Sequence, residues 1–545
     1  MGRFQFRPRK TQPIHNMNLR LLPFVVLTLA AMRTHAQGEW TQALQSSAPT
    51  IEGGTVTRIC PDNGVVSLGY YRDQAIFDDH ALPGGFPSQN VVFVVKHDQT
   101  GVVEWTRAIT NTDPNDWVVG HGMDVDSEGN IIVGGTAIDT ILVDGAYATH
   151  VANAQGTEAM FIIKFSPTGA VLWSVDVEST AFGSELMSLV VDPSDNVWFC
   201  GPISSAASKA FKLNGATGIE MVETGVIPGQ VRQIDTDAAG NVYVRGQSLT
   251  SFTLNGVTCP TNTVMEGDMT NWTGKLDSNG VAQWFHVPDQ GHLGFSPWQN
   301  ANQAAAPDGH CYVEAYDDMR INGDTLSEGA NARGLYLLDA SGTPVWWTRL
   351  NRSGMVQVDD MTTDPFGNCW VSGTCAGVID LLDTLVEHTG FFAFHIGVDG
   401  RVLQRVFGPP VLHAYSVDAV ADEAVFGGEY SSTISFGEHE VTDNLRGLFV
   451  ARYSYPSDVS VSERTTSFTF AAFPNPAQVH LRLAGLPQGV VAVEVLGAQG
   501  QLLQRNDRFN AQQDAIDLSP LPAGPLFVRV RTAAAEACVR IIHLP

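Results

Sequence analysis

Two pairs of neighbouring acids, Asp317-Asp318 and Asp359-Asp360, are the residues whose type could support hydrolysis of a glycosidic bond. That reaction needs two carboxyl groups a few ångströms apart, one as an acid and one as a nucleophile or base. Adjacent residues of a strand point to opposite faces, so the members of each pair are not expected to act together. We interpret both pairs as surface charge, and the sequence predicts no catalytic residue.

Other local signatures of catalysis are absent from the sequence. It contains no His-Glu-x-x-His zinc motif, no Gly-x-Ser-x-Gly nucleophile elbow and no phosphate-binding loop of the Gly-rich Lys-Ser/Thr type. Its 15 histidines form no tight local cluster. The run from Asp124 to Asn130 superficially resembles a calcium loop, but the Glu that ends such a loop is missing. The sequence therefore predicts no metal site and no cofactor.

Aromatic and histidine residues in four long segments are the best candidates for ligand binding. These segments, 110–121, 178–186, 288–301 and 351–357, are expected to form loops on one rim of the molecule, and binding residues often lie on loops of a rigid scaffold. Aromatic side chains there can stack on a sugar or a peptide, although they can also pack within their own loop. The candidates are Trp117, His121, His292, Phe295 and Trp298.

Length and composition indicate repeated β-structure behind these candidates. A chain of 545 residues is too long for one ordinary core, so it should contain several domains or repeats. Its 53 glycines and 28 prolines, with 16% charged residues, suit short strands joined by turns. The formal charge is −26, and this acidity makes nucleic acid an unsuitable partner.

The seven cysteines do not form a disulfide framework, because they are scattered and odd in number. Cys369 and Cys375 are close enough in sequence to pair in an oxidising compartment. Cys369 also lies in a strand-like run, where a cysteine can serve as a small core residue. The sequence leaves both interpretations open.

The N-terminus has the pattern of a secretory signal peptide. Arg20 precedes the apolar run 21–32, and small Ala36 precedes Gln37. We expect cleavage between Ala36 and Gln37. The apolar run is shorter than a membrane-spanning helix, and no other segment is apolar enough to span, so the mature chain should have no transmembrane span.

A pair of hairpins recurs between residues 53 and about 453. The first hairpin has an apolar strand, a turn of the Asp-x-x-Gly-Asn type and a strand that ends in Gly. The turn Asp can bond its own backbone and the turn Gly accepts a positive φ, so these acids are interpreted as structural. Clear copies occupy 122–136, 188–202, 233–247, 303–315 and 360–374, and weaker ones 58–70 and 416–429.

The second hairpin places a tryptophan four residues after its turn glycine. A Trp at one fixed strand position offers a large flat face for packing between neighbouring sheets. In the copy at 391–407 that position is Gln404. The four pairs are Gly101 and Trp105, Gly169 and Trp173, Gly280 and Trp284, and Gly342 and Trp346.

Four strands per unit and about seven units predict an all-β fold, a β-propeller over residues 37–455. A parallel β-helix is the weaker alternative, because its rungs are shorter and lack paired tight turns. The last unit lacks a Trp strand, whereas residues 38–44 copy 103–109. The N-terminal strand is therefore expected to complete the last blade and close the ring, which places Trp40 near Val450.

These repeats resemble those of secreted bacterial propellers with SBBP-like repeats and, more distantly, NHL-like propellers. The resemblance covers residues 38–455 and implies a fold that serves either binding platforms or enzymes.

After a linker at 456–466, residues 467–545 alternate apolar positions with turn signals. About seven short strands and a small β-sandwich are expected there. The segment contains Phe473, Pro474, Asn475, Pro476, Asp517, Gly524 and Arg540. With these residues it resembles the type A C-terminal sorting domain of the type IX secretion system. That resemblance implies that the secretion machinery is a partner and that the protein is secreted or held at the outer cell surface.

Two functions remain open at this point. The favoured one is a binding or adhesion module for a glycan or protein; the alternative is an extracellular enzyme that degrades polysaccharide or peptide with its site in the propeller channel. Three or more acids or histidines that converge in the channel would favour the enzyme, and an apolar or featureless channel would favour binding.

Overall fold

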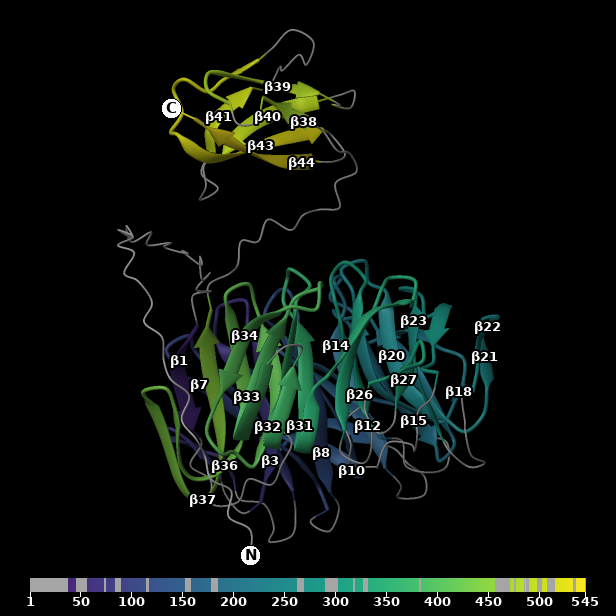
Figure 1. The fold of residues 1–545 in the computed structure, drawn as a ribbon. Helices are drawn as coiled ribbons and strands as arrows, with labels where there is room; N and C mark the ends of the chain where they lie inside the picture. Colours follow the sequence, from purple (N-terminus) through teal and green to yellow (C-terminus); the bar gives the residue numbers. More distant parts are fainter. Residues whose placement is uncertain are drawn as a thin grey trace, which may run out of the picture.

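The computed structural model describes residues 38–544 with internal gaps. The gaps are 46–55, 73–74, 84–89, 114–116, 152–157, 178–184, 262–268, 290–301, 317–318, 327–331, 382–383, 456–470, 475–476, 485, 487–489, 497–501, 507–514 and 533–535. Within the described residues the regular elements are strands, as the sequence predicted (Figure 1).

The described part of residues 38–455 forms seven antiparallel sheets of four or more strands, which are the blades of a β-propeller. The first contains β2 (Val56–Ile59), β3 (Val65–Tyr71), β6 (Val91–His97), β7 (Val103–Asn111), β10 (Asp139–Val143) and β11 (Ala146–Val151). The second contains β8 (Val118–Val125), β9 (Ile131–Ala137), β12 (Ala159–Phe165) and β13 (Val171–Val177). The third contains β14 (Ser188–Val191), β15 (Val197–Ser204), β16 (Ala207–Leu213), β17 (Glu220–Glu223) and β18 (Ile227–Pro228).

The other four sheets follow the same order along the chain. They are β19 (Gln230–Thr236), β20 (Val242–Ser248), β23 (Thr270–Leu276) and β24 (Ala282–His286); β25 (Gln303–Ala305), β26 (Cys311–Tyr316), β29 (Arg333–Leu338) and β30 (Pro344–Arg349); β31 (Asn351–Thr363), β32 (Cys369–Leu381), β33 (Thr384–Ile396) and β34 (Val402–Phe407); and β35 (His413–Ala419), β36 (Glu423–Phe436), β37 (His439–Ser454) and β1 (Glu39–Gln45).

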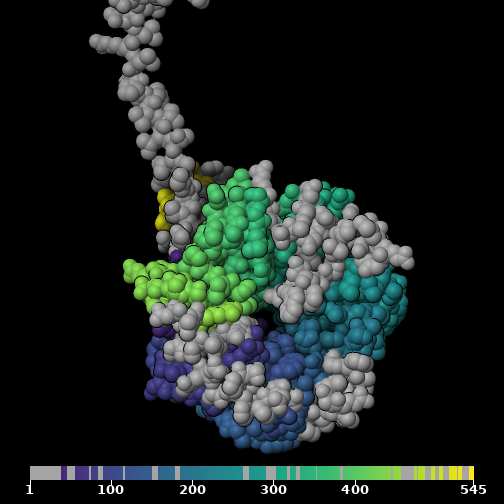
Figure 2. Space-filling view, turned by 90° about the horizontal axis from the view of Figure 1, so that it is seen from below, coloured from purple at the N-terminus to yellow at the C-terminus, as the bar shows by residue number. Residues whose placement is uncertain are grey.

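The first strands of the sheets line the centre of a closed ring. Strand β2 contacts β8, and the contacts continue through β14, β19, β25, β31 and β35, which returns to β2. Viewed along the ring, the colours run in sequence order from purple to light green and meet again (Figure 2). Each sheet therefore presents its first strand to a central channel.

The N-terminal strand closes this ring. Strand β1 pairs with β37, with Trp40 opposite Tyr453 and Leu44 opposite Val450. The last sheet thus takes three strands from the end of the propeller and its outermost strand from the beginning. This confirms the closure predicted from the copied Trp strand, and it removes an open sheet edge.

The tight turns have the chemistry that the repeat predicted. In the turn after β8, one oxygen of Asp126 accepts the backbone N–H groups of Glu128 and Asn130. Trp105 donates its indole N–H to the carbonyl of Pro167 in the neighbouring sheet's turn. Gly169 in that turn has φ of +79°, and a Cβ there would lie 2.8 Å from the Trp105 ring. The turn glycine is thus required both by its backbone and by the indole packed on it.

Small hairpins in the connections between second and third strands were not predicted. Asp144, in the turn from β10 to β11, accepts the backbone N–H of Ala108 in β7. Asn255, in the turn between β21 and β22, accepts the N–H of Ala282 in β24. These hairpins support the outer strands. The separate ones are β4 (Ile76–Phe77) with β5 (His80–Ala81), β21 (Phe252–Leu254) with β22 (Val257–Cys259), and β27 (Arg320–Ile321) with β28 (Asp324–Thr325).

The expectation of a loop at 351–357 is wrong. These residues lie in β31, a strand of 13 residues that pairs with β32 along its whole length. The sequence of this segment favoured a loop because it combines polar residues with Gly354. In the structure the long partner strand β32 supplies its backbone hydrogen bonds.

Cys369 and Cys375 form no disulfide, since both belong to a set of six cysteines that are free and buried: Cys60, Cys200, Cys259, Cys311, Cys369 and Cys375. Burial raises the pKa of the Cys60 thiol to about 12 and that of Cys375 to about 11. In the folded protein we expect these six thiols to react with iodoacetamide at least about 100-fold more slowly than an exposed free thiol, because the thiolate is the nucleophile. After unfolding in urea all six should react completely. Mass spectrometry of the labelled peptides checks this, and fast labelling of Cys369 before unfolding would contradict it.

The C-terminal region forms two further sheets. One contains β38 (Ala471–Phe473), β39 (His480–Ala484) and β42 (Ile516–Asp517). The other contains β40 (Val490–Leu496), β41 (Leu502–Asn506), β43 (Gly524–Thr532) and β44 (Glu536–His543). Side chains from both, such as Leu481 and Val528, belong to one buried apolar cluster.

Candidate functional site: the central channel

Four aspartates and one arginine from different first strands lie in the channel. Asp124, Asp235, Asp360 and Asp418 come from β8, β19, β31 and β35, and Arg58 comes from β2. The Arg58 Nε lies 3.7 Å from Asp124 Oδ1. The first strand of each sheet faces the channel. A single acid on each of several first strands therefore brings several carboxyl groups together.

Each of these aspartates connects its strand to the next one. Asp124 Oδ2 accepts the N–H of Val191 in β14 at 2.7 Å, and Asp235 Oδ2 accepts that of Ala305 in β25 at 2.7 Å. In the same way Asp418 Oδ2 accepts the N–H of Ile59 in β2 at 2.7 Å. These bonds hold neighbouring blades in register.

A cavity of about 300 Å³ lies among these residues. Its wall also includes Ser188, Thr236 and Thr362. Pro193 and Pro307, which belong to tight turns after the first strands, contribute to the wall as well. The cavity therefore extends toward the face that carries the tight turns, opposite the rim on which the sequence placed the binding loops.

The channel carboxyl groups have raised pKa values. Burial raises the pKa of Asp235 to about 7 and that of Asp360 to about 6. The pKa values of Asp124 and Asp418 are also raised by burial, against the opposing effect of Arg58. Burial lowers the pKa of Arg58, but Asp418 and Asp124 outweigh it and the net direction is upward. One guanidinium thus faces four acids in a poorly solvated space.

The interpretation of Asp359 and Asp360 as surface charge is wrong. Asp359 is 2% exposed, and Asp360 lines the channel. The register of β31 against β32 shifts between Val358 and Asp360, so a bulge removes the strict alternation of faces. Both carboxylates consequently accept N–H groups near β35, Asp359 from Ala414 and Asp360 from Val417.

Replacement of Asp235 by Asn should change stability in a pH-dependent way. The folded state holds a proton on Asp235 that the unfolded chain releases near pH 4, so its stabilising contribution is present below that pH and is lost as pH rises through about 7. The stability of Asp235→Asn relative to wild type should therefore rise by about 3 kcal/mol between pH 4.5 and 8. Urea unfolding at several pH values measures this. Asp98→Asn is the control, because the pKa of the exposed Asp98 is lowered and its difference from wild type should stay flat.

Buried ion pairs between the third strand and the first turn were missed by the sequence analysis. Lys164 Nζ lies 2.7 Å from Asp126 Oδ2, and the two side chains are 6% and 1% exposed. A lysine at the end of an otherwise apolar strand, as in the run 160–165, was the available signal. The equivalent pairs are Lys96 with Asp62, Lys212 with Asp192 and Lys275 with Asp237.

Two of the five predicted ligand residues lie in the described region. Trp117 is half-buried just before β8, and His121 is in β8 with its Nε2 3.9 Å from Glu185 Oε1. Burial lowers the pKa of His121 to about 4. His292, Phe295 and Trp298 lie outside the described residues, as do the predicted cleavage residues Ala36 and Gln37.

The residues predicted for the sorting domain lie at strand ends and turns. Phe473 ends β38 and is 47% exposed, and Pro474 follows it. Asp517 ends β42 and accepts the N–H of Ser519, and this bond and the Ser519 side chain lower the pKa of Asp517. Gly524 begins β43, and Arg540 in β44 pairs with Phe527. Asn475 and Pro476 lie outside the described residues.

Residues 471–543 match the family model of the secretion system C-terminal sorting domain. This match and the strands of the region identify a domain that marks proteins for the type IX secretion machinery. The protein is therefore exported, and it is secreted or attached to the cell surface. No curated protein has a significantly similar sequence.

Solved structures similar to this chain include two propellers. The WD40 β-propeller domain of Doa1 has a TM-score of 0.41 at 10% identity, over 76% of this chain and 96% of that one. The Dos1 propeller has a TM-score of 0.37 at 9% identity, over 76% and 95%. A protein of unknown function from Dyadobacter fermentans has a TM-score of 0.37 at 9% identity, over 77% and 100%. The closed ring of sheets and the matched C-terminal region define a β-propeller with a type IX sorting domain. Within the part of the chain that the structure describes, no helix is long and apolar enough to cross a membrane.

Proposed function

We propose that the exported propeller is a binding or adhesion module whose ligand enters the channel cavity. The observation that carries this proposal is that the channel aspartates already accept backbone N–H groups from neighbouring blades. Asp235, for example, accepts the N–H of Thr236 on one oxygen and that of Ala305 on the other. Carboxylates fixed in this way form a rigid array of acceptors, which suits recognition better than it suits proton transfer.

The opposite rim is a second region for ligand contact in this proposal. Trp117 and His121 lie there, and the sequence adds His292, Phe295 and Trp298. An aromatic ring at this rim can stack on a sugar or peptide independently of the cavity, which extends toward the opposite face.

A glycan and peptide array probed with the mature chain from Gln37 tests the binding function. Asp360→Asn should weaken binding of any hit at least about tenfold if the ligand occupies the cavity, and Trp117→Ala should do so if it occupies the rim. Val102→Ala, at an exposed position in the turn between β6 and β7, is the matched control. A protein that binds no member of either array, or binding that none of these variants alters, would contradict the proposed sites.

The alternative function is an extracellular enzyme that degrades polysaccharide or peptide. Its support is that four acids converge in the channel, which is the condition that the sequence analysis set for an enzyme. Asp235 with a pKa near 7 and Asp360 with a pKa near 6 have values that suit a general acid or base at neutral pH. Hydrolysis of polysaccharides by the wild type, abolished in both Asp235→Asn and Asp360→Asn while the fold is retained, would favour this function over binding.

The domain boundaries complete the proposal. Residues 1–36 act as a signal peptide that is cleaved before Gln37, 37–455 form the propeller, 456–466 are a linker and 467–545 are the sorting domain with a sandwich of two sheets. N-terminal sequencing of the exported protein tests the first boundary.

A further inference from the structure

Three neighbouring first strands, β19, β25 and β31, contribute hydrogen-bond acceptors to one side of the channel cavity. Asp235, Gln303 and Asp360 come from these strands in that order, and all three line the cavity of about 300 Å³. The strands contact one another in the same order around the ring. A cavity of this volume is in the range of small-molecule pockets. These residues therefore form a candidate site for one group of an organic ligand.

The carboxyl groups of Asp235 and Asp360 retain the capacity to accept hydrogen bonds. Each accepts one backbone N–H group on each of its oxygens. The donors are Thr236 and Ala305 for Asp235, and Met361 and Val417 for Asp360. A carboxylate has about four acceptor sites, so about two on each aspartate remain for a ligand.

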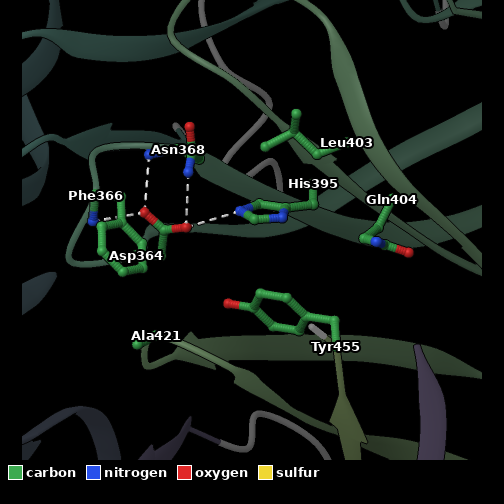
Figure 3. Close-up of a pocket in the computed structure, with 8 residues that line it drawn as sticks. All are labelled: Asp364, Phe366, Asn368, His395, Leu403, Gln404, Ala421 and Tyr455. Carbon is green, nitrogen blue, oxygen red and sulfur yellow. Dashed lines mark hydrogen bonds and ion pairs between the residues drawn. The ribbon is translucent and has the colours of Figure 1, made fainter. Parts of the chain in front are cut away.

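An acid of the sixth sheet shows the contrast. Asp364 lines a cavity of about 10 Å³, which has room for one water molecule. The backbone N–H groups of Phe366 and Asn368 contact its Oδ1, and the side chains of Asn368 and His395 contact its Oδ2 (Figure 3). These four bonds occupy its acceptor sites. Asp364 therefore bonds within the protein, whereas Asp235 and Asp360 have sites to spare.

The side-chain oxygen of Gln303 is a further acceptor. Gln303 is 1% exposed, and its Nε2 donates to the carbonyl of Tyr243 at 2.9 Å. Its backbone N–H and carbonyl are both bonded to the side chain of Gln233. Among the described residues Oε1 has no hydrogen-bond partner. A buried acceptor without a donor is unfavourable, so a ligand that donates to Oε1 is favoured there.

The positive charge of the channel lies away from Asp235. Burial lowers the pKa of Arg58, and the four channel aspartates raise it. Among these four, Asp418 and Asp124 have the largest effects and Asp235 has the smallest. Arg58 Nε also lies 3.7 Å from Asp124 Oδ1. A cation supplied by a ligand is thus best accommodated on the side of β19, β25 and β31.

The residues of the cavity wall are mostly polar. Four of them are half-buried and uncharged: Ser188, Gln233, Thr236 and Thr362. Three of the apolar wall residues are 5% exposed or less and belong to buried apolar clusters: Leu189, Ile234 and Met361. The wall therefore suits a ligand with hydroxyl groups better than one with an alkyl chain.

We propose that the channel ligand carries a primary ammonium group on a hydroxylated scaffold, as an amino sugar does, and that this group binds among Asp235, Gln303 and Asp360. An ammonium group has three donors and no acceptor, which matches acceptors on three strands. Its hydrogen bonds to carboxylates are charge-assisted and therefore among the stronger ones. This assignment rests on the proposed binding function of the cavity and adds the chemical class of the ligand.

Calorimetric titration of the mature chain from Gln37 with glucosamine and with N-acetylglucosamine tests the ligand class. Acetylation removes the positive charge and keeps the sugar ring. At about pH 6.5, where an amine of this kind is protonated, glucosamine should bind at least about tenfold more tightly. Equal affinity, or no binding of glucosamine, overturns the proposal. In either case an array ligand whose binding depends on Asp360 would leave the proposed binding function standing.

Cadaverine separates the hydroxylated scaffold from the charge alone. This aliphatic diamine carries ammonium groups and no hydroxyl group, so it should bind more weakly than glucosamine at the same ionic strength. Cadaverine that binds as tightly as glucosamine overturns the assignment of an amino sugar.

Variants test the placement of the ammonium group. Asp235→Asn and Asp360→Asn should each weaken glucosamine binding about tenfold, because each removes a carboxylate charge. Gln303→Met removes the acceptor and should weaken binding about threefold, and it serves if either aspartate variant does not fold. Asp98→Asn, in the turn between β6 and β7, is the control and should bind as the wild type does. Glucosamine affinity that stays at the control value in all three variants overturns the proposal.

Discussion

Replacement of Trp40 by alanine should lower the free energy of unfolding by about 2–4 kcal/mol and promote aggregation. Strand β1 is the outermost strand of the last sheet, and Trp40 is its principal anchor. The Trp40 ring lies 4.8 Å from Phe436, 5.1 Å from Tyr453 and 5.8 Å from Phe426, measured between ring centroids. Without the indole, β1 should detach and expose the edge of β37, which can then pair with another chain.

Urea unfolding and size-exclusion chromatography measure these two effects. Trp173→Ala is the matched control. Trp173 also packs against the next sheet and donates to Gly215, but its strand β13 follows its partner β12 directly in the chain. We expect comparable loss of stability in both variants and aggregation in Trp40→Ala alone. A Trp40→Ala protein that stays monomeric, with stability near that of the wild type, would show that β1 does not hold the ring closed.

Replacement of Lys164 by methionine should cost about 3–5 kcal/mol, because it leaves the buried Asp126 carboxylate without its cation. Lys164 Nζ also donates to the carbonyl of Gly215 in the next sheet at 2.7 Å. Burial raises the pKa of Asp126, but the ion pair with Lys164 and the hydrogen bonds from Asn130 outweigh it and the net direction is downward. The ion pair and the bond to Gly215 together connect two blades. Unfolding in urea at pH 7 is the measurement.

A double variant separates the ion pair from simple loss of packing. Lys164→Met with Asp126→Asn should be more stable than Lys164→Met alone, because Asn retains an acceptor for the turn and carries no buried charge. Lys209→Met is the control, since Lys209 pairs with Glu223 at a more exposed site and should change stability by less than about 1 kcal/mol. If Lys209→Met and Lys164→Met are equally costly, burial of the pair is not the cause.

Residues that act through local chemistry were predictable from the sequence. The turn acids, the turn glycines and the Trp strands repeat at fixed offsets, and each has one dominant role, so their spacing predicted blades and even the exchange of β1 into the last sheet. Lys164 was not recognised, because its partner Asp126 is 38 positions away and pairs with it only across the folded sheet. The sequences Asp144-Gly145 and Asn255-Gly256 strongly favour tight hairpin turns, but we had included both in segments expected to be long loops.

The channel could not be predicted, since its aspartates come from strands that lie far apart in the sequence. Asp124 and Asp235 each precede a turn acid by two residues, yet neighbouring units have Val190 and Ala304 at that position. The burial of Asp359 could not be predicted from alternation, because alternation assumes regular pairing between two strands and a bulge interrupts that pairing.

The exchange of β1 also determines how the propeller responds to mechanical load. If the C-terminal end is held at a surface, a pulling force enters at Tyr455 and acts along β37. That strand of 16 residues is hydrogen-bonded to β36 on one side and to β1 on the other. To extract it, both ladders must slide at once, so many bonds share the tension, and a tethered molecule can withstand drag from flowing liquid without unravelling from its end.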